Sequence, residues 1–268
     1  MRKKVKLDGS EVASFIKDRQ RHAVRALKQS AHVQPRLAIV RSAGNPAVDI
    51  YLRLKRSYAD EIGVEIVIHE ADKKNVDKIL NLLSKDDSVQ GIILQLPFEN
   101  LDDLDRTFDN IAPEKDVDNL RGDSIYDAPT SVAVLWLLAA YNIDLPGKNI
   151  VVIGQGRLVG LPLTKMLFAS GIEPIVIDEA TKNRENIIAE ADIIITGVGK
   201  PGIIKSSTIK AGAMVIDAGI ASDNGVMKGD VEDAARERED ISITPRVGGV
   251  GPLTVAALFE NLIRASQK

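Results

Sequence analysis

Short, fully apolar runs separated by amphipathic stretches are the feature that most constrains how this chain can fold. Such runs occur in both halves of the sequence, and most are followed by the apolar spacing of a helix. Strands that alternate with helices predict βαβ units and parallel sheets, an α/β fold. The predicted strands are 37–40, 64–68 and 91–96 in the first half and 149–154, 174–178, 192–196 and 214–217 in the second.

An acidic connection divides this pattern into two lobes. Residues 99–130 are rich in aspartate and predict a solvated, loop-like segment. The apolar helix expected at 131–141, capped by Thr130 or Ser131, then leads into the second lobe. We therefore predict an N-terminal α/β domain over 1–130 and a Rossmann-like domain over 131–252, with the C-terminal helix 253–268 packing back on the first.

Composition excludes several classes of protein and site. Cysteine is absent, so the chain has no disulfide, no zinc–thiolate site and no cysteine nucleophile. The three histidines lack metal-ligand spacing, and no metal site is expected. A net charge of −3 and 4% aromatic residues argue against a nucleic-acid partner, and no apolar run is long enough to span a membrane. We expect a cytoplasmic protein.

A glycine-rich turn in the second lobe predicts a nucleotide site. Gly154, Gln155 and Gly156 follow a predicted strand, and Gly160 precedes the next helix. Glycines allow a tight turn and the close approach of a pyrophosphate, to which the helix N-terminus offers N–H groups. The spacing is one residue longer than the usual fingerprint, so a plain glycine-rich βα turn is the alternative.

Asp178 favours the nucleotide interpretation. It ends the next strand, where a carboxylate can accept hydrogen bonds from the adenosine ribose hydroxyls. Small residues follow the two later strands, which lets a dinucleotide lie across the carboxyl edge of the sheet. The candidate cofactor-binding residues are Gly154, Gln155, Gly156, Asp178, Gly197, Gly199 and Ile220. Together they indicate a nicotinamide nucleotide.

Four polar residues of the first lobe are candidates for a reacting site. Tyr51 and Lys55 are four positions apart and share one face of a predicted helix. Gln95 ends an apolar strand just before Pro97, and Asp118 lies in the acidic connection. Three have plainer alternatives: an unpaired surface lysine, a satisfied strand-end amide and a solvated loop carboxylate.

A series of motifs resembles one known family across nearly the whole chain. In order, they are Leu7-Asp8-Gly9, Tyr51-x-x-x-Lys55, Gln95-Leu96-Pro97, Lys115-Asp116-Val117-Asp118, Val152-Ile153-Gly154, Val159-Gly160-x-Pro162, Gly229-Asp230-Val231, Ile243-Thr244-Pro245 and Gly248-Gly249-Val250-Gly251-Pro252-x-Thr254. The set resembles the bifunctional methylenetetrahydrofolate dehydrogenase/methenyltetrahydrofolate cyclohydrolase family.

The resemblance implies two reactions at one site. A hydride passes from 5,10-methylenetetrahydrofolate to the nicotinamide, and water then opens the methenyl product to 10-formyltetrahydrofolate. The resemblance implies that Lys55 orients water and moves protons, and that Gln95 holds Lys55 in place. It implies folate contacts from Tyr51, from Asp118 on the pterin, and from the later residues Gly251, Pro252 and Thr254. It also implies a homodimer.

Some positions depart from the family's pattern near the expected substrate site. Val48 stands where a serine is usual, Asn119 replaces a glycine, and Arg246-Val247 replaces Val-Pro. The segment 119–130 is also shorter than usual. Two alternatives therefore stay open: a non-catalytic folate- or nucleotide-binding relative, and a dehydrogenase that lacks the cyclohydrolase activity.

The choice between NAD and NADP rests on the strand end at Asp178. The resemblance favours NADP, which many bacterial members use. Asp178 and Glu179 favour NAD, because two carboxylates repel a 2′-phosphate but can accept a bond from a 2′-hydroxyl. Arg157 or Lys182 could offset that repulsion. We therefore expect NAD, with NADP as the alternative.

Overall fold

Contacts divide the chain into two compact units in the computed structural model, which describes residues 4–43, 46–101, 103–223 and 226–267. One unit comprises 14–129 and 255–268 and contains a sheet of three strands; we call it the three-stranded unit. The other comprises 1–13 and 130–254 and contains a sheet of five strands; we call it the five-stranded unit.

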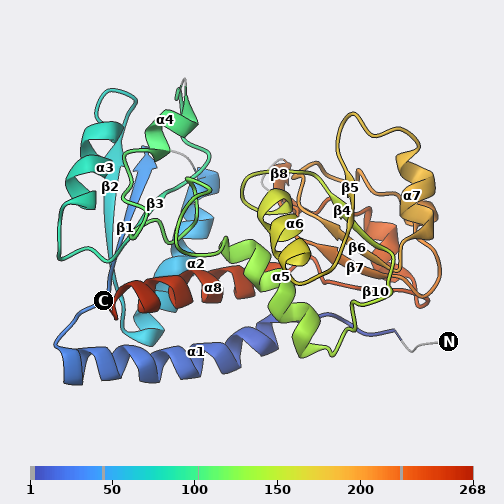
Figure 1. Cartoon of the computed structure of the whole chain (residues 1–268), viewed down its shortest axis with the longest axis horizontal. Helices are drawn as coiled ribbons and strands as arrows, with labels where there is room; N and C mark the ends of the chain where they lie inside the picture. The colour runs from blue at the N-terminus through green and yellow to red at the C-terminus, as the bar shows by residue number, and fades with distance from the viewer. Residues whose placement is uncertain (1–3, 44–45, 102, 224–225, 268) are drawn as a thin grey trace. The chain divides into compact units, whose positions relative to one another are not determined.

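The three-stranded unit is a parallel sheet flanked by helices (Figure 1). Its strands are β1 (Arg36–Ser42), β2 (Glu65–Ala71) and β3 (Gly91–Leu94), and its helices include α2 (Pro46–Ile62) and α3 (Val76–Ser84). The central strand β1 places Val40 opposite His69 on one side and Leu94 on the other. The three predicted strands of this lobe are present, but β3 ends at Leu94, before the cis Leu96–Pro97 peptide.

The acidic connection is not entirely a loop. It contains the short helix α4 (Leu104–Phe108), and Asp103 caps this helix by accepting a hydrogen bond from the Arg106 N–H at 3.1 Å. The prediction of an unstructured segment was therefore wrong at α4, because one of its aspartates serves as a helix cap.

The C-terminal helix packs on the first lobe, as predicted. Helix α8 (Val250–Ala265) belongs to the three-stranded unit from Val255 onward, as does α1 (Gly9–Ala26) from Ser14 onward; α1 continues into η1 (Leu27–Ala31). In that unit the Phe259 ring stacks on Tyr58 with centroids 5.2 Å apart, and the Tyr58 hydroxyl donates to Gln20 Oε1 at 2.7 Å. Helix α8 begins three residues earlier than the predicted Leu253, because Pro252 fits a first turn that needs no N–H donor from it.

The five-stranded unit is a parallel sheet of order β10-β7-β6-β4-β5 (Figure 1). Its strands are β4 (Ile150–Ile153), β5 (Ile175–Ile177), β6 (Ile193–Thr196), β7 (Met214–Asp217) and β10 (Ser242–Ile243). Between β7 and β10 in the sequence, β8 (Ala221–Asp223) and β9 (Val226–Lys228) form a separate antiparallel pair. Its helices are α5 (Pro129–Ala140), α6 (Gly160–Ala169), α7 (Arg184–Glu190), η2 (Ser206–Thr208) and η3 (Asp233–Glu237). The central strands β4 and β6 are buried throughout, as their unbroken apolar sequences require.

The predicted cap of the helix at 131–141 was wrong. Helix α5 begins at Pro129, which places Thr130 and Ser131 inside its first turn. The Ser131 hydroxyl donates to the Val159 carbonyl at 3.0 Å and so ties α5 to the turn before α6.

Among the described residues, no helix combines the length and the apolar character that crossing a bilayer requires.

Candidate functional site

The structure brings Lys55 and Gln95 together at the carboxyl end of the three-stranded sheet. Lys55 lies on α2, and its Nζ donates to Gln95 Oε1 at 2.7 Å. Gln95 follows β3, is 8% exposed, and is fixed by its N–H to the Val40 carbonyl at 2.8 Å and by its Nε2 to the Leu96 carbonyl at 2.9 Å. The amide therefore presents its oxygen to the ammonium group in one orientation.

Burial shifts the proton affinities of Lys55 and Asp118 in opposite directions. It lowers the pKa of Lys55, and the negative charge of Asp118 partly opposes this. It raises the pKa of Asp118 to about 6; the attraction of Lys55 opposes the rise and the charge of the neighbouring Asp116 adds to it. Both groups are therefore closer to neutrality than an exposed lysine and aspartate, which suits residues that exchange protons near neutral pH.

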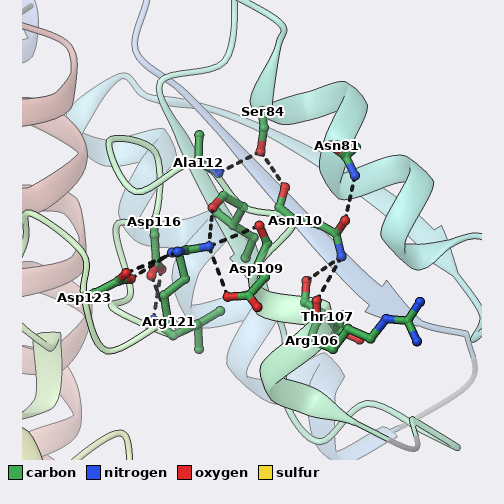
Figure 2. Close-up of polar contacts among 12 residues, drawn as sticks. Asn81, Ser84, Arg106, Thr107, Asp109, Asn110, Ala112, Asp116, Arg121 and Asp123 are labelled. Carbon is green, nitrogen blue, oxygen red and sulfur yellow. Dashed lines mark hydrogen bonds and ion pairs between the residues drawn. The ribbon is translucent and has the colours of Figure 1, made fainter.

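Asp118 has no hydrogen-bond partner for its carboxylate in the part of the chain that the structure describes. Its neighbour Asp116 differs: it is fully buried and accepts N–H groups from Leu120 at 3.0 Å and Arg121 at 2.9 Å (Figure 2). Asp118 is only partly buried, so its carboxylate oxygens are open to a ligand that supplies donors.

Tyr51 lies one turn before Lys55 on α2 and is half-buried. Burial raises the pKa of its hydroxyl, which therefore stays protonated and can donate a hydrogen bond. The departure at Val48 falls on a side chain outside the described residues.

The departure at Asn119 has a backbone explanation. Asn119 adopts φ 53°, in the left-handed region that glycine enters freely and that asparagine tolerates better than most other residues. The turn that carries Asp118 is therefore compatible with either residue.

The predicted nucleotide-binding glycines lie in the five-stranded unit where β4 meets α6. A Cβ on Gly160 would lie 1.8 Å from the Gly154 carbonyl oxygen, so packing requires glycine there. At Gly156 a Cβ would have only the Gly197 oxygen within reach, at 4.0 Å, so the space over this turn is open. The residues present fit the approach of a pyrophosphate to the helix N-terminus.

The other predicted cofactor residues follow neighbouring strands. Gly197 and Gly199 follow β6 and the half-exposed Ile220 follows β7, with the Ile220 oxygen 3.6 Å from where a Gly199 Cβ would be. Gln155 donates to Thr164 Oγ1 at 3.2 Å, so its side chain turns back onto α6. Because β4, β6 and β7 are adjacent and parallel, these loops share the carboxyl edge of the sheet.

Asp178 is exposed at the end of β5, and its carboxylate is partly engaged in its own turn. Asp178 Oδ1 accepts the Thr181 hydroxyl at 2.7 Å and the Ala180 N–H at 3.0 Å. Glu179 pairs with Lys200 at 2.5 Å. Of the two carboxylates expected to repel a 2′-phosphate, Glu179 is thus neutralised by a lysine that the sequence did not single out.

Sequence reasoning missed two buried carboxylates beneath these loops. Asp230, from the Gly-Asp-Val motif, accepts the Thr196 hydroxyl at 2.7 Å and the N–H groups of Val198 and Lys200 at 2.7 and 2.8 Å. Asp217 accepts the Arg236 guanidinium at 2.6 Å and the Asp230 N–H at 3.1 Å. The motif itself was the available signal, since an aspartate next to a strand end can hold loop N–H groups.

The departure at Arg246 joins this group of charges. Its guanidinium pairs with Asp233, which lies 3.6 Å from the Arg236 guanidinium. Arg236 in turn binds Asp217, so Arg246 is one end of a chain of ion pairs at the last strands.

Three predicted substrate contacts lie on α8 in the five-stranded unit. These are Gly251, Pro252 and Thr254; the Thr254 hydroxyl donates to the Val250 carbonyl at 3.3 Å. Tyr51 and Asp118 belong to the three-stranded unit, and a joint role of the two groups stays a prediction.

Comparisons with known proteins agree with the motifs. The family model for the tetrahydrofolate dehydrogenase/cyclohydrolase catalytic domain matches residues 7–118, and that for the NAD(P)-binding domain of the same family matches 128–268. The bifunctional protein FolD of Lactobacillus delbrueckii subsp. bulgaricus is 33% identical over 275 residues, 98% of this chain and 97% of that protein.

Solved structures show the same likeness. The bifunctional FolD enzyme of Campylobacter jejuni is 32% identical and superposes with a TM-score of 0.90, covering 98% of each chain. The Trypanosoma brucei FolD, solved with NADP cofactor and an inhibitor, is 28% identical with a TM-score of 0.90, covering 100% of this chain and 98% of that one. This chain therefore belongs to the tetrahydrofolate dehydrogenase/cyclohydrolase family of enzymes.

Proposed function

We propose that this enzyme oxidises 5,10-methylenetetrahydrofolate with a nicotinamide nucleotide and hydrolyses the methenyl product to 10-formyltetrahydrofolate. The observation that carries the proposal is the half-buried Lys55 held on Gln95 at 2.7 Å, in the part of the chain that matches the catalytic-domain model. A protein that only binds folate has no need of a lysine whose pKa is lowered and whose position is fixed.

The dehydrogenase step depends on positioning. When bound, the nicotinamide accepts a hydride from the one-carbon bridge of the folate. Asp118 accepts hydrogen bonds from pterin N–H groups, which orients the ring, and Tyr51 lies against the folate near the bridge. Holding two reactants in the right geometry is the main contribution that side chains can make to such a transfer.

The cyclohydrolase step needs proton movement. Water adds to the cationic methenyl carbon, and the neutral amine of Lys55 takes the proton that leaves this water. The bond from the carbon to N5 then breaks as the remaining hydroxyl proton leaves the oxygen and N5 gains a proton. The formyl group remains on N10, and the proton held by Lys55 is released to water. The lowered pKa of Lys55 makes the neutral amine accessible, and Gln95 keeps its nitrogen aimed at the reacting water.

The cofactor we propose is NAD, with NADP as the alternative. Support comes from Asp178, an exposed carboxylate at the end of β5, where it can accept bonds from a ribose 2′-hydroxyl. Lys200, paired with Glu179, is the residue that could instead turn toward a 2′-phosphate. A Cβ at Gly156 or Gly199 would meet nothing nearer than 3.6 Å, which leaves room for the backbone to approach the pyrophosphate. Gly154 and Gly197 are required by packing instead, because a Cβ there would clash with Val198 and Val159.

A homodimer and a cytoplasmic location are part of this proposal. Large apolar side chains are exposed in the five-stranded unit at Leu161 and Phe168 on α6 and at Ile175 on the edge strand β5, with 42%, 52% and 42% exposure. Such side chains are typical of an interface core. Light scattering on the purified protein measures the oligomeric state directly, and a monomer at all concentrations would contradict the dimer.

One assay tests both reactions. In the first measurement, methylenetetrahydrofolate is added with NAD or NADP, and the absorbance of the reduced nicotinamide is followed. In the second, methenyltetrahydrofolate is added without cofactor, and the loss of its absorbance is followed. We expect turnover in both measurements. Binding of both ligands without turnover would identify a non-catalytic relative, and reduction without methenyl hydrolysis above the uncatalysed rate would identify a dehydrogenase alone.

A further inference from the structure

The turn that carries Asp118 is tied down by the guanidinium of Arg121. Arg121 forks onto Asp123, with Nε at 2.8 Å and Nη2 at 3.2 Å, and its Nη1 donates to the carbonyls of Asp109 and Ile111 at 3.1 and 3.4 Å (Figure 2). One side chain thus joins the segments on either side of Asp118. Only 16% of the Arg121 side chain is exposed, whereas Asp123 is 65% exposed, so the guanidinium is held by the number and geometry of its bonds while its partner carboxylate faces water.

Asp116 closes the same turn from within. Its two carboxylate oxygens accept the N–H groups of Leu120 and Arg121, and its carbonyl accepts the Ser124 hydroxyl at 2.7 Å. The backbone between Asp116 and Arg121 is therefore fixed at both ends, with Asp118 in the middle.

The segment that contains Asp109 and Ile111, whose carbonyls accept bonds from Arg121, is itself hydrogen-bonded to α3. Asn81 donates to Asn110 Oδ1 at 2.6 Å, and Ser84 donates to the Asn110 carbonyl at 2.9 Å while accepting the Ala112 N–H at 2.9 Å (Figure 2). Arg121 therefore connects the Asp118 turn to a helix that packs on the sheet, not to a free loop.

Asn261 on α8 holds the turn from another element. Its Nδ2 donates to the Val117 and Asp127 carbonyls, both at 2.9 Å. These contacts fix the turn through the residues around Asp118, while the Asp118 carboxylate accepts no hydrogen bond from the residues that the structure describes. The arrangement positions a group for an external partner.

We propose that Arg121 is a positioning residue that holds Asp118 in the orientation in which it binds the pterin of the substrate. The inference rests on the proposed function, since it assumes that Asp118 contacts the folate. Arg121 acts only through Asp118 and the turn, and its guanidinium is occupied by Asp123, by the Asp109 carboxylate at 3.4 Å and by two carbonyls. It therefore affects folate recognition and leaves nucleotide recognition unchanged.

The test combines Arg121→Ala with Asp118→Ala in a double-mutant cycle. We expect Arg121→Ala to raise the folate KM about tenfold, with a smaller change in kcat and an unchanged dissociation constant for the nicotinamide nucleotide. In the Asp118→Ala background the same change should add less than about twofold, because the group that Arg121 positions is gone. A residue with only a general structural role would give additive losses in both backgrounds.

Two further variants serve as controls. Arg106→Ala removes the same charge from a side chain that points away from the cluster, as Figure 2 shows, and should leave the folate KM unchanged. Arg121→Lys keeps the positive charge but cannot make the two parallel bonds to Asp123, so it should give a KM between those of the wild type and Arg121→Ala. If Arg121→Ala does not fold, the Arg121→Lys variant tests the proposal in its place.

The outcomes distinguish the role of Arg121 from that of Asp118. If Asp118→Ala raises the folate KM but Arg121→Ala and Arg121→Lys do not, the inference about Arg121 is wrong and the proposed role of Asp118 stands. Additive losses in the cycle, or an equal loss of nucleotide affinity, would also overturn it. If Asp118→Ala leaves the folate KM unchanged, both fail.

Discussion

The two units treat their buried carboxylates in opposite ways. In the five-stranded unit Asp230 is fully buried and accepts three hydrogen bonds, and Asp217 beside it binds the Arg236 guanidinium and backbone N–H groups. In the three-stranded unit Asp118 is partly buried and accepts none from the described residues, with its closest charges on Lys55 and Asp116. Protein donors thus fill the carboxylate oxygens of the aspartates in one unit and leave those of Asp118 unfilled in the other.

The difference separates structural from chemical use of a charge. A carboxylate whose oxygens are filled by backbone donors fixes the loops that supply them, and leaves no capacity for a ligand. A carboxylate that is partly withdrawn from water and accepts no protein donor is less well solvated than an exposed one, and a ligand that brings donors relieves this. Asp230 therefore shapes the loops after β6 and β7, while Asp118 is poised for substrate.

The largest effect is expected at Lys55, whose charge opposes the rise in the pKa of Asp118. Lys55→Met should lower the cyclohydrolase rate by about 10²–10⁴-fold, the usual contribution of a positioned acid–base group, and leave nucleotide affinity unchanged. Loss of methenyl absorbance measures the rate, and fluorescence titration measures nucleotide binding. Arg56→Met, on the exposed side of the same helix, is the matched control. Methenyl hydrolysis at the wild-type rate in Lys55→Met would remove the lysine from the mechanism.

The stability of two aspartate variants sharpens the comparison directly. Asp230→Ala leaves the Thr196 hydroxyl and two N–H groups without an acceptor and should lower the free energy of unfolding by about 3–5 kcal/mol. Asp118→Ala removes a charge without donors and should leave this free energy unchanged or raise it by about 1 kcal/mol. Urea denaturation at neutral pH measures both, and equal losses would erase the distinction between the two sites.

The pH dependence of folate binding follows from the pKa of about 6 at Asp118. Between the ordinary carboxyl pKa of 3.8 and about 6, the folded protein binds a proton that the unfolded chain does not, so stability from this group falls as pH rises. Folate binding has the opposite sign, because the ionised form accepts the pterin donors. The folate KM should therefore rise about tenfold per pH unit below 6, and this limb should be lost in Asp118→Asn.

The smallest expected effect concerns the cofactor. NAD should be preferred over NADP by at least about tenfold in kcat/KM, and Asp178→Ser should reduce this preference toward equality, since tenfold corresponds to only about 1.4 kcal/mol. Glu173→Ser, before the opposite end of β5, removes the same charge as a control. A strong NADP preference that Asp178→Ser leaves unchanged would show that Asp178 points away from the ribose.

The sequence predicted most of the fold because its strands are unbroken apolar runs. The runs at β1, β4 and β6 are buried on both faces, and their length and spacing were sufficient to place them. Helix ends were harder: the start of α5 at Pro129 and of α8 at Val250 depend on proline fitting a first turn, a feature that the apolar spacing does not contain.

The candidate site was predictable only in part. The spacing of Tyr51 and Lys55 placed both on one helix, and the strand end placed Gln95. The bond between Lys55 and Gln95, however, depends on how α2 packs against the sheet. The roles of Asp230 and Arg121 depend on bonds between segments far apart in sequence, such as Asp230 to Thr196. No local pattern reports such bonds, which only the assembled fold defines.

Direct titration of Asp118 tests the central claim most closely. Carboxyl carbons of aspartate are labelled with ¹³C and followed by NMR across pH, with and without bound tetrahydrofolate, and the Asp118 signal is assigned by its loss in Asp118→Asn. We predict a pKa of about 6 in the free protein, falling by at least about one unit when the pterin supplies donors to the charged form. An ordinary pKa near 3.8 in the free protein, or a value that tetrahydrofolate does not move, would contradict the account.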